Sequence, residues 1–94
     1  MQNTHAFEPW PENTVARYLT VGTATVDVTY TPSEDLRAAC QGERCSWRGW
    51  AVTEVRYDDS AEAIDQKITD ALPPLQRDVQ RHAETCRAMP RPTQ

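Results

Sequence analysis

The chain has 94 residues and a formal net charge of −4, with 14 acidic and 10 basic side chains. This length predicts a single domain with a small core, and neither a membrane-spanning apolar run nor a secretory leader pattern is present. The three cysteines are too few and odd in number for a disulfide framework, and without a leader they favour metal binding in a reducing cytoplasm. The expected localisation is therefore cytoplasmic.

The N-terminal stretch lacks the periodicity of a helix or a strand. Residues 1–13 contain Pro9 and Pro11, and we expect them to form a flexible arm before a single domain over residues 14–94. Trp10, between the two prolines, either docks on the domain or contacts a protein partner.

A β-hairpin is predicted next. Val26, Val28 and Tyr30 alternate with polar residues, which indicates a half-buried strand. Gly22 would take the positive φ of a two-residue turn before it. The strand on the other side of that turn starts at Thr14, and its apolar residues are Val15, Leu19 and Val21.

Two further strands are expected over residues 36–40 and 45–56, joined by a turn in which Gly42 allows a backbone that a side chain would disfavour. The alternation places Trp47 on one face of the second strand and Trp50 on the other. We expect Trp47 to pack in the core or to cover a metal site, and Trp50 to be a candidate protein contact.

Two helices are predicted for the last third of the chain. Asp59 followed by Glu62 is typical of an N-cap and the third helical residue. Pro73 and Pro74 are expected to end this helix and to start a second one. The second helix carries one stripe of residues spaced 4, 3, 4 and 3 apart: Leu75, Val79, His82, Cys86 and Met89.

A metal site is the strongest chemical prediction. Cys40 and Cys45 flank a Gly-containing turn, and His82 and Cys86 lie one helical turn apart. Three thiolates and an imidazole are a ligand set that structural Zn²⁺ prefers, in a tetrahedron. The alternative is three free cysteines and a solvated histidine.

A carboxylate is the expected partner of the histidine ring. Asp78 precedes His82 by four residues on the predicted helix, and a metal-bound histidine usually donates its other ring N–H to such a group. The alternative is that Asp78 pairs with Arg81.

The order Cys-x4-Cys on a turn and His-x3-Cys on a helix, carried by Cys40, Cys45, His82 and Cys86, resembles the CCHC variant of the ββα zinc finger. The chain departs from that family in its additional N-terminal hairpin and in the insertion over residues 57–73. The ending His82–Pro90 is also similar to short actinomycete proteins, often phage- or plasmid-associated. Both resemblances imply zinc, and zinc-finger helices bind either DNA or protein.

The predicted fold class is α+β, a small antiparallel β meander with two C-terminal helices, zinc-finger-like. Four protein ligands leave zinc no open position, so we expect no enzyme and no small-molecule substrate. Because no apolar run has membrane-spanning length, we expect no membrane contact. A zinc-stabilised protein-interaction or regulatory module is favoured, because a net charge of −4 opposes attraction to phosphates. A thiol redox switch that releases zinc and a nucleic-acid-binding protein remain the alternatives. The candidate nucleic-acid contacts are Arg44, Arg48, Gln76, Arg77, Gln80 and Arg81.

Overall fold

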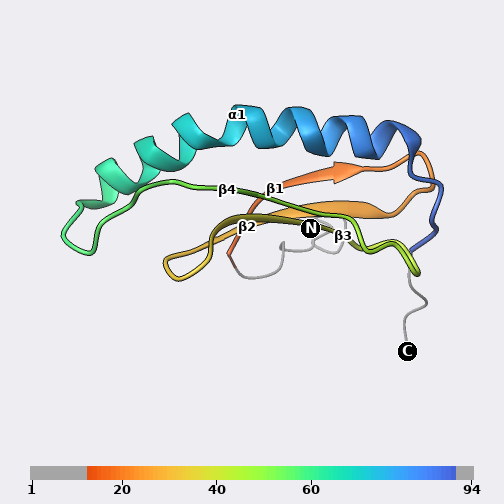
Figure 1. Cartoon of the computed structure of the whole chain (residues 1–94), viewed down its shortest axis with the longest axis horizontal. Coiled ribbons are helices and arrows are strands. Elements are labelled where there is room, and N and C mark those ends of the chain that lie inside the picture. Colours follow the sequence, from red (N-terminus) through yellow and green to blue (C-terminus); the bar gives the residue numbers. More distant parts are fainter. Residues whose placement is uncertain (1–12, 91–94) are drawn as a thin grey trace, which may run out of the picture.

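The computed structural model describes residues 13–90, which form one antiparallel sheet covered by one helix (Figure 1). The strands β1 (Thr14–Leu19), β2 (Thr25–Thr31), β3 (Asp35–Cys40) and β4 (Arg48–Ala51) follow one another in the sheet in chain order. The helix α1 (Ala61–Thr85) runs along one face of this sheet. The α+β class and the β meander are therefore confirmed. Within residues 13–90 no helix has both the length and the apolarity needed to cross a membrane.

The core lies between α1 and the two central strands. Val26 and Val28 of β2 and Leu36 of β3 are completely buried, and they meet Leu75 and Val79 of α1. Successive side chains of a strand point to opposite faces, so the alternation read from the sequence of β2 corresponds to the side that α1 covers. The predicted arm, including Trp10, lies outside the described residues except for Asn13, whose carbonyl accepts a hydrogen bond from the Tyr30 N–H at 3.0 Å.

The strand β1 buries only part of the set expected. Its register with β2 shifts between Thr14 and Ala16, which is the signature of a β-bulge. Val15, at the bulge, packs against the core as expected, together with its neighbour Ala16 and with Tyr18. Leu19 alternates with Tyr18 and shares the outer face of Arg17, so it is 70% exposed, and Val21 is 54% exposed.

One helix replaces the two that were predicted. Pro73 and Pro74 lie inside α1, and both are exposed. A proline in a helix interior removes one N–H donor and crowds the carbonyl four residues earlier. The carbonyls that lose a partner belong to Thr69 and Asp70, which are exposed residues that water can reach. The first turns of α1 slope relative to the rest (Figure 1), as expected of a helix bent by proline.

Both ends of the helix differ from the prediction. The N-cap is Ser60, whose hydroxyl accepts a hydrogen bond from the Ala63 N–H at 3.1 Å. Asp59 instead accepts from the Arg56 N–H at 2.8 Å and from the Lys67 ammonium at 2.7 Å. At the other end Cys86 leaves the helical conformation, so α1 ends at Thr85 and the predicted stripe residue Met89 lies beyond it, 67% exposed.

The last strand is shorter than residues 45–56. It begins only at Arg48, because the residues before it approach the end of α1. Beyond Ala51 the N–H and hydroxyl of Thr53 bond to the Asp35 carboxylate, and Glu54 takes a positive φ of 61°. These contacts take the place of the backbone hydrogen bonds between β3 and β4, so the strand ends at Ala51.

Replacing both prolines tests whether residues 61–85 form one continuous helix. Pro73→Ala with Pro74→Ala restores two helical N–H donors, so we expect the free energy of unfolding to rise by about 1 kcal/mol or more, after allowance for the more flexible unfolded chain. Urea denaturation and far-UV circular dichroism measure stability and helicity. Two separate helices would instead gain nothing or lose stability when their boundary is removed.

The Asp59 contact predicts a pH dependence. Hydrogen bonding by the Arg56 N–H and then Lys67 lowers the pKa of Asp59. A lowered pKa in the folded state contributes stability above the unfolded-state value of about 3.9, and this contribution is lost as pH falls through the folded-state value. We therefore expect Asp59→Asn to be less stable than the parent at pH 7 and equally stable at about pH 2. Asp58→Asn, an exposed neighbour, serves as the control, and an Asp59 effect that persists unchanged at low pH would contradict the assignment.

Candidate metal centre

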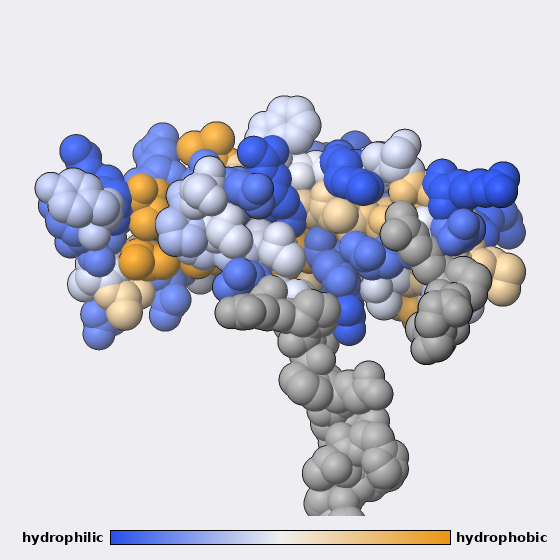
Figure 2. Space-filling view, turned by 90° about the horizontal axis from the view of Figure 1, so that it is seen from below, coloured by the Kyte–Doolittle hydropathy of each residue, from blue (hydrophilic) through white to orange (hydrophobic). Residues whose placement is uncertain are grey.

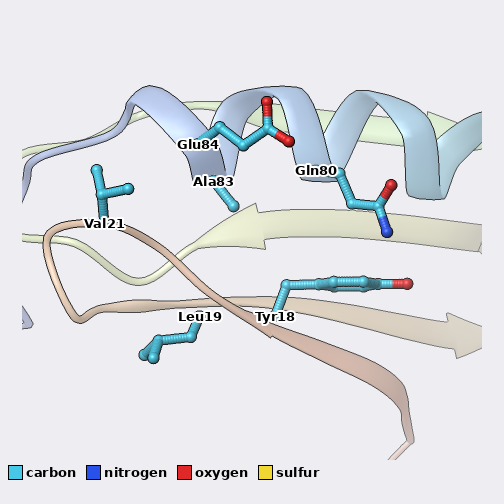
Figure 3. A pocket seen from close by; sticks show the side chains of 6 residues that line it. All are labelled: Tyr18, Leu19, Val21, Gln80, Ala83 and Glu84. Carbon is cyan, nitrogen blue, oxygen red and sulfur yellow. The ribbon is translucent and has the colours of Figure 1, made fainter.

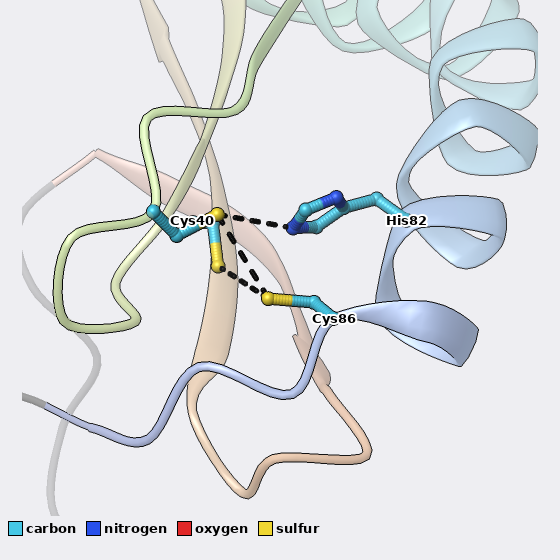
Figure 4. A group of neighbouring side chains, drawn as sticks. Cys40, His82 and Cys86 are labelled. Carbon is cyan, nitrogen blue, oxygen red and sulfur yellow. Dashed lines mark hydrogen bonds between the residues drawn. The ribbon is translucent and has the colours of Figure 1, made fainter.

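Four side chains from two distant parts of the chain converge at one end of the molecule. Cys40 is the last residue of β3, and Cys45 follows the turn after it. His82 lies in the last turn of α1, and Cys86 is its C-cap. Figure 4 shows Cys40 pointing from the strand side toward His82 and Cys86 on the helix side. Their ligand atoms all lie within 4.8 Å of one another, so the group could hold a metal ion.

Three of the six separations between ligand atoms fit a tetrahedral zinc ion. Zn–S bonds of about 2.3 Å and a Zn–N bond of about 2.0 Å require S···S separations of about 3.8 Å and an S···N separation of about 3.6 Å. The Cys86 Sγ lies 3.8 Å from the sulfurs of both Cys40 and Cys45, and the Cys45 Sγ lies 3.5 Å from Nε2 of His82. All three thiols are free, and 3.8 Å is far too long for a disulfide.

Backbone N–H groups support the two strand-side sulfurs in the same way. Gly42 donates to the Cys40 Sγ at 3.4 Å, and the Trp47 N–H is the largest cause of the lowered pKa of Cys45. In each case the donor is two residues after the cysteine, as expected from a turn whose N–H groups point toward a metal-bound sulfur. Burial nevertheless raises the pKa of Cys40 to about 11, so this thiol gives up its proton at neutral pH only when a cation is bound beside it.

Trp47 covers the histidine. Its ring stacks on the imidazole of His82, with centroids 4.7 Å apart and planes inclined by 14°. Gly49 makes room for the indole, because a Cβ there would lie 3.1 Å from Cη2 of Trp47. Burial lowers the pKa of His82 and so favours the neutral imidazole, which is the form that binds metals. The expectation that Trp47 covers the site agrees with this stack.

Asp78 does not accept the hydrogen bond from His82 that was predicted for it. Its carboxylate lies 3.7 Å from Arg81, and no hydrogen bond joins it to His82 among the described residues. Asp78 and Arg81 are 59% and 77% exposed, so their contact is a weak surface pair. The geometry therefore matches the alternative stated for Asp78.

The segment after Cys86 lies against two turns of the sheet, and this was not foreseen. The Gly22 N–H donates to the Cys86 carbonyl at 3.0 Å, and the Glu43 N–H donates to Met89 at 2.6 Å. Neither Gly22 nor Gly42 has the positive φ expected of it; Thr23 and Arg44 do, at 72° and 65°. The glycines are needed for space. A Cβ on Gly22 would lie 2.5 Å from the Ala88 carbonyl oxygen, and one on Gly42 would lie 2.6 Å from the Ala88 Cβ.

The six candidate nucleic-acid contacts do not form one surface. Arg44 is exposed in the turn between Cys40 and Cys45, and Arg48 lies in β4 on the face away from α1. The other four are on α1, on the opposite side of the sheet. Gln80 borders a groove between α1 and β1 and lies above Tyr18 (Figure 3). The residues proposed from the sequence to contact a nucleic acid together are therefore divided between the two sides of the sheet.

No protein-family model, curated protein or solved structure matches this chain. The resemblance to the CCHC zinc finger therefore stays a prediction.

Trp47 offers a test of how the histidine is held. We expect Trp47→Leu to weaken zinc affinity by about tenfold, because groups that orient a ligand typically matter by that factor. A competition titration with a chromogenic chelator measures the affinity. Trp50→Leu is the matched control, since that ring is 66% exposed and lies on the other face of β4. Equal effects of the two variants would contradict a role for the stacked ring.

Proposed function

We propose that this protein is a small non-catalytic binding module whose fold is stabilised by one structural Zn²⁺. The observation that carries the proposal is the convergence of three sulfurs and one imidazole nitrogen within 4.8 Å. Zinc suits this donor set because thiolate and imidazole ligands favour it over the harder cations Mg²⁺ and Ca²⁺. The proposed ligands are Cys40, Cys45, His82 and Cys86.

A structural role follows from the number of donors. Four protein ligands complete a tetrahedron, which leaves no position for a water molecule or a substrate. His82, the only histidine within residues 13–90, belongs to the set, so it does not serve as a general acid or base. Both features support a non-catalytic module.

The metal adds a link that the core lacks. Seven residues form the buried hydrophobic cluster, a small core for a chain of this length. Zinc would tie the turn after β3 to the end of α1, which connects segments far apart in the sequence. Metal affinity in such a domain contributes directly to the free energy of folding.

A protein partner and a nucleic acid remain the two candidate partners. The acidic net charge favoured a protein, whereas the placement of Arg37, Arg48 and Trp50 on the face of the sheet opposite α1 favours a nucleic acid. For a thiol switch the cysteines differ. Cys40 is buried and its raised pKa disfavours the reactive thiolate, whereas Cys45 is partly exposed and its lowered pKa favours one.

Zinc loading tests the proposal. Native mass spectrometry of the reduced protein should find one zinc per chain, and chelation should remove most tertiary order, as seen by near-UV circular dichroism and amide exchange. Cys45→Ser and His82→Ala should each reproduce that loss, because each removes one ligand. Glu84→Gln, an exposed change between two ligands on the same segment, should keep the metal and the fold. A reduced protein that stays fully folded without zinc would overturn the structural role.

A further inference from the structure

The face of the sheet opposite α1 carries two arginines and a tryptophan side by side. A Cβ on Gly49 would lie 3.0 Å from Leu75 of α1, so Gly49 faces the helix and its neighbours Arg48 and Trp50 face away. Directly across the strands Trp50 pairs with Arg37, and Arg48 pairs with Ala39. Figure 2 views the molecule from this side, where hydrophilic side chains predominate. The most strongly hydrophobic residues in view gather toward the end at which α1 begins, and more weakly hydrophobic ones lie in the middle and at the other end. We call this side of the sheet, as formed by residues 13–90, the open face.

Both arginines are held in place by carbonyl groups and not neutralised by a carboxylate. Arg37 donates from Nε to the Glu34 carbonyl at 2.9 Å, and Arg48 donates from Nη1 to the Trp47 carbonyl at 2.8 Å. Within residues 13–90 neither guanidinium has a carboxylate within 4.0 Å. Arg17 on the same face behaves differently, because its guanidinium forms two hydrogen bonds, at 2.7 Å and 3.0 Å, with the Asp27 carboxylate.

These side chains border a shallow groove of about 300 Å³. The small side chain of Ala39 forms its floor between the arginines, and Trp50 is 66% exposed at its edge. Glu34 is the acidic residue that lines it.

We propose that the open face binds single-stranded nucleic acid, with a base stacked on Trp50 and phosphates held by Arg37 and Arg48. An exposed aromatic ring beside cations is the combination that proteins use for single strands, since every base offers a flat face and every nucleotide a phosphate. Bases in a duplex are already stacked, so a flat ring on a sheet does not reach them. An acidic peptide would satisfy the arginines but would leave the ring unused. The proposal names a partner for the zinc-stabilised module inferred above, and its surface contains none of the four metal ligands.

Fluorescence anisotropy with the zinc-loaded full chain and labelled twelve-nucleotide oligo-U or oligo-dT tests this proposal. We expect binding at low salt, with log K falling against log salt at a slope of about −1.4 for two phosphate contacts. Trp50→Ala should weaken binding by about tenfold or more, because stacking contributes on the order of 1–3 kcal/mol per base. Arg37→Ala should weaken binding and reduce the slope by about 0.7.

A matched control distinguishes binding at the open face from binding at other basic residues of the protein. Arg77→Ala removes an exposed arginine from α1, on the covered side of the sheet, and should leave binding unchanged. Each variant is checked for its zinc content and its circular dichroism spectrum, so a folding defect is recognised. Three results would overturn the proposal: no binding at low salt, equal loss in Arg77→Ala and Arg37→Ala, or competition by oligoglutamate as effective as by the oligonucleotide. A protein that holds one zinc and binds no oligonucleotide would refute the nucleic-acid surface alone, whereas a folded zinc-free protein would refute the structural metal.

Discussion

The meeting of the last turn of α1 with the turn after β3 is the constraint on which the rest of the structure depends. Cys40 and Cys45 must lie close to His82 and Cys86, although 37 sequence positions separate Cys45 from His82. The sheet and the helix have to place them within bonding range of one point. A core of seven buried residues fixes the helix on the sheet, and the cysteine and histidine side chains fix where the helix ends.

This constraint explains several local features that would otherwise be unconnected. Cys86 leaves the helix as its C-cap, and the chain beyond it passes close to two turns of the sheet. That passage is possible only where both turns lack a side chain, at Gly22 and Gly42. On the other side of the site Gly49 leaves space for Trp47 to lie flat against His82. All three glycines of the chain thus serve close packing around one end of the molecule, and none serves a left-handed backbone.

The sequence was a good guide where the pattern was local and regular. The alternation of β2 and the spacing of the four candidate ligands each depend on one element or one turn, and the structure agrees with both. The prolines were misleading because the free-energy cost of proline inside a helix was considered alone. The apolar stripe that continues from one side of the prolines to the other was not taken into account. Ile68, Leu72, Leu75 and Val79 follow one another at helical spacing without a change of phase, and burial of that continuous stripe outweighs two missing N–H donors.

Other features of the structure left no recognisable pattern in the sequence of the element concerned. The bulge in β1 shows only in its register with β2, so the packing of both Val15 and Ala16 against the core could not be read from β1 alone. The close approach of Ala88 to Gly22 joins residues far apart in the chain, and glycine at a turn is more often explained by its backbone freedom. The pairing of Asp78 with Arg81 depends on side-chain rotation, which helical spacing leaves undecided.

The division of charge between the two sides of the sheet explains why the net charge is a poor guide to a partner. The helix α1 carries five acidic and three basic side chains, and one of those bases, Arg81, already faces Asp78. On the open face the acid Asp27 is matched by Arg17, and Glu34 is the one acid that lines the groove against the two cations Arg37 and Arg48. Charges separated by more than about 8 Å are largely screened at physiological salt, so the acids of α1 scarcely reduce the attraction that Arg37 exerts on a nearby phosphate. A chain with a net charge of −4 can therefore present a locally cationic surface, provided that its acids lie elsewhere or already have partners.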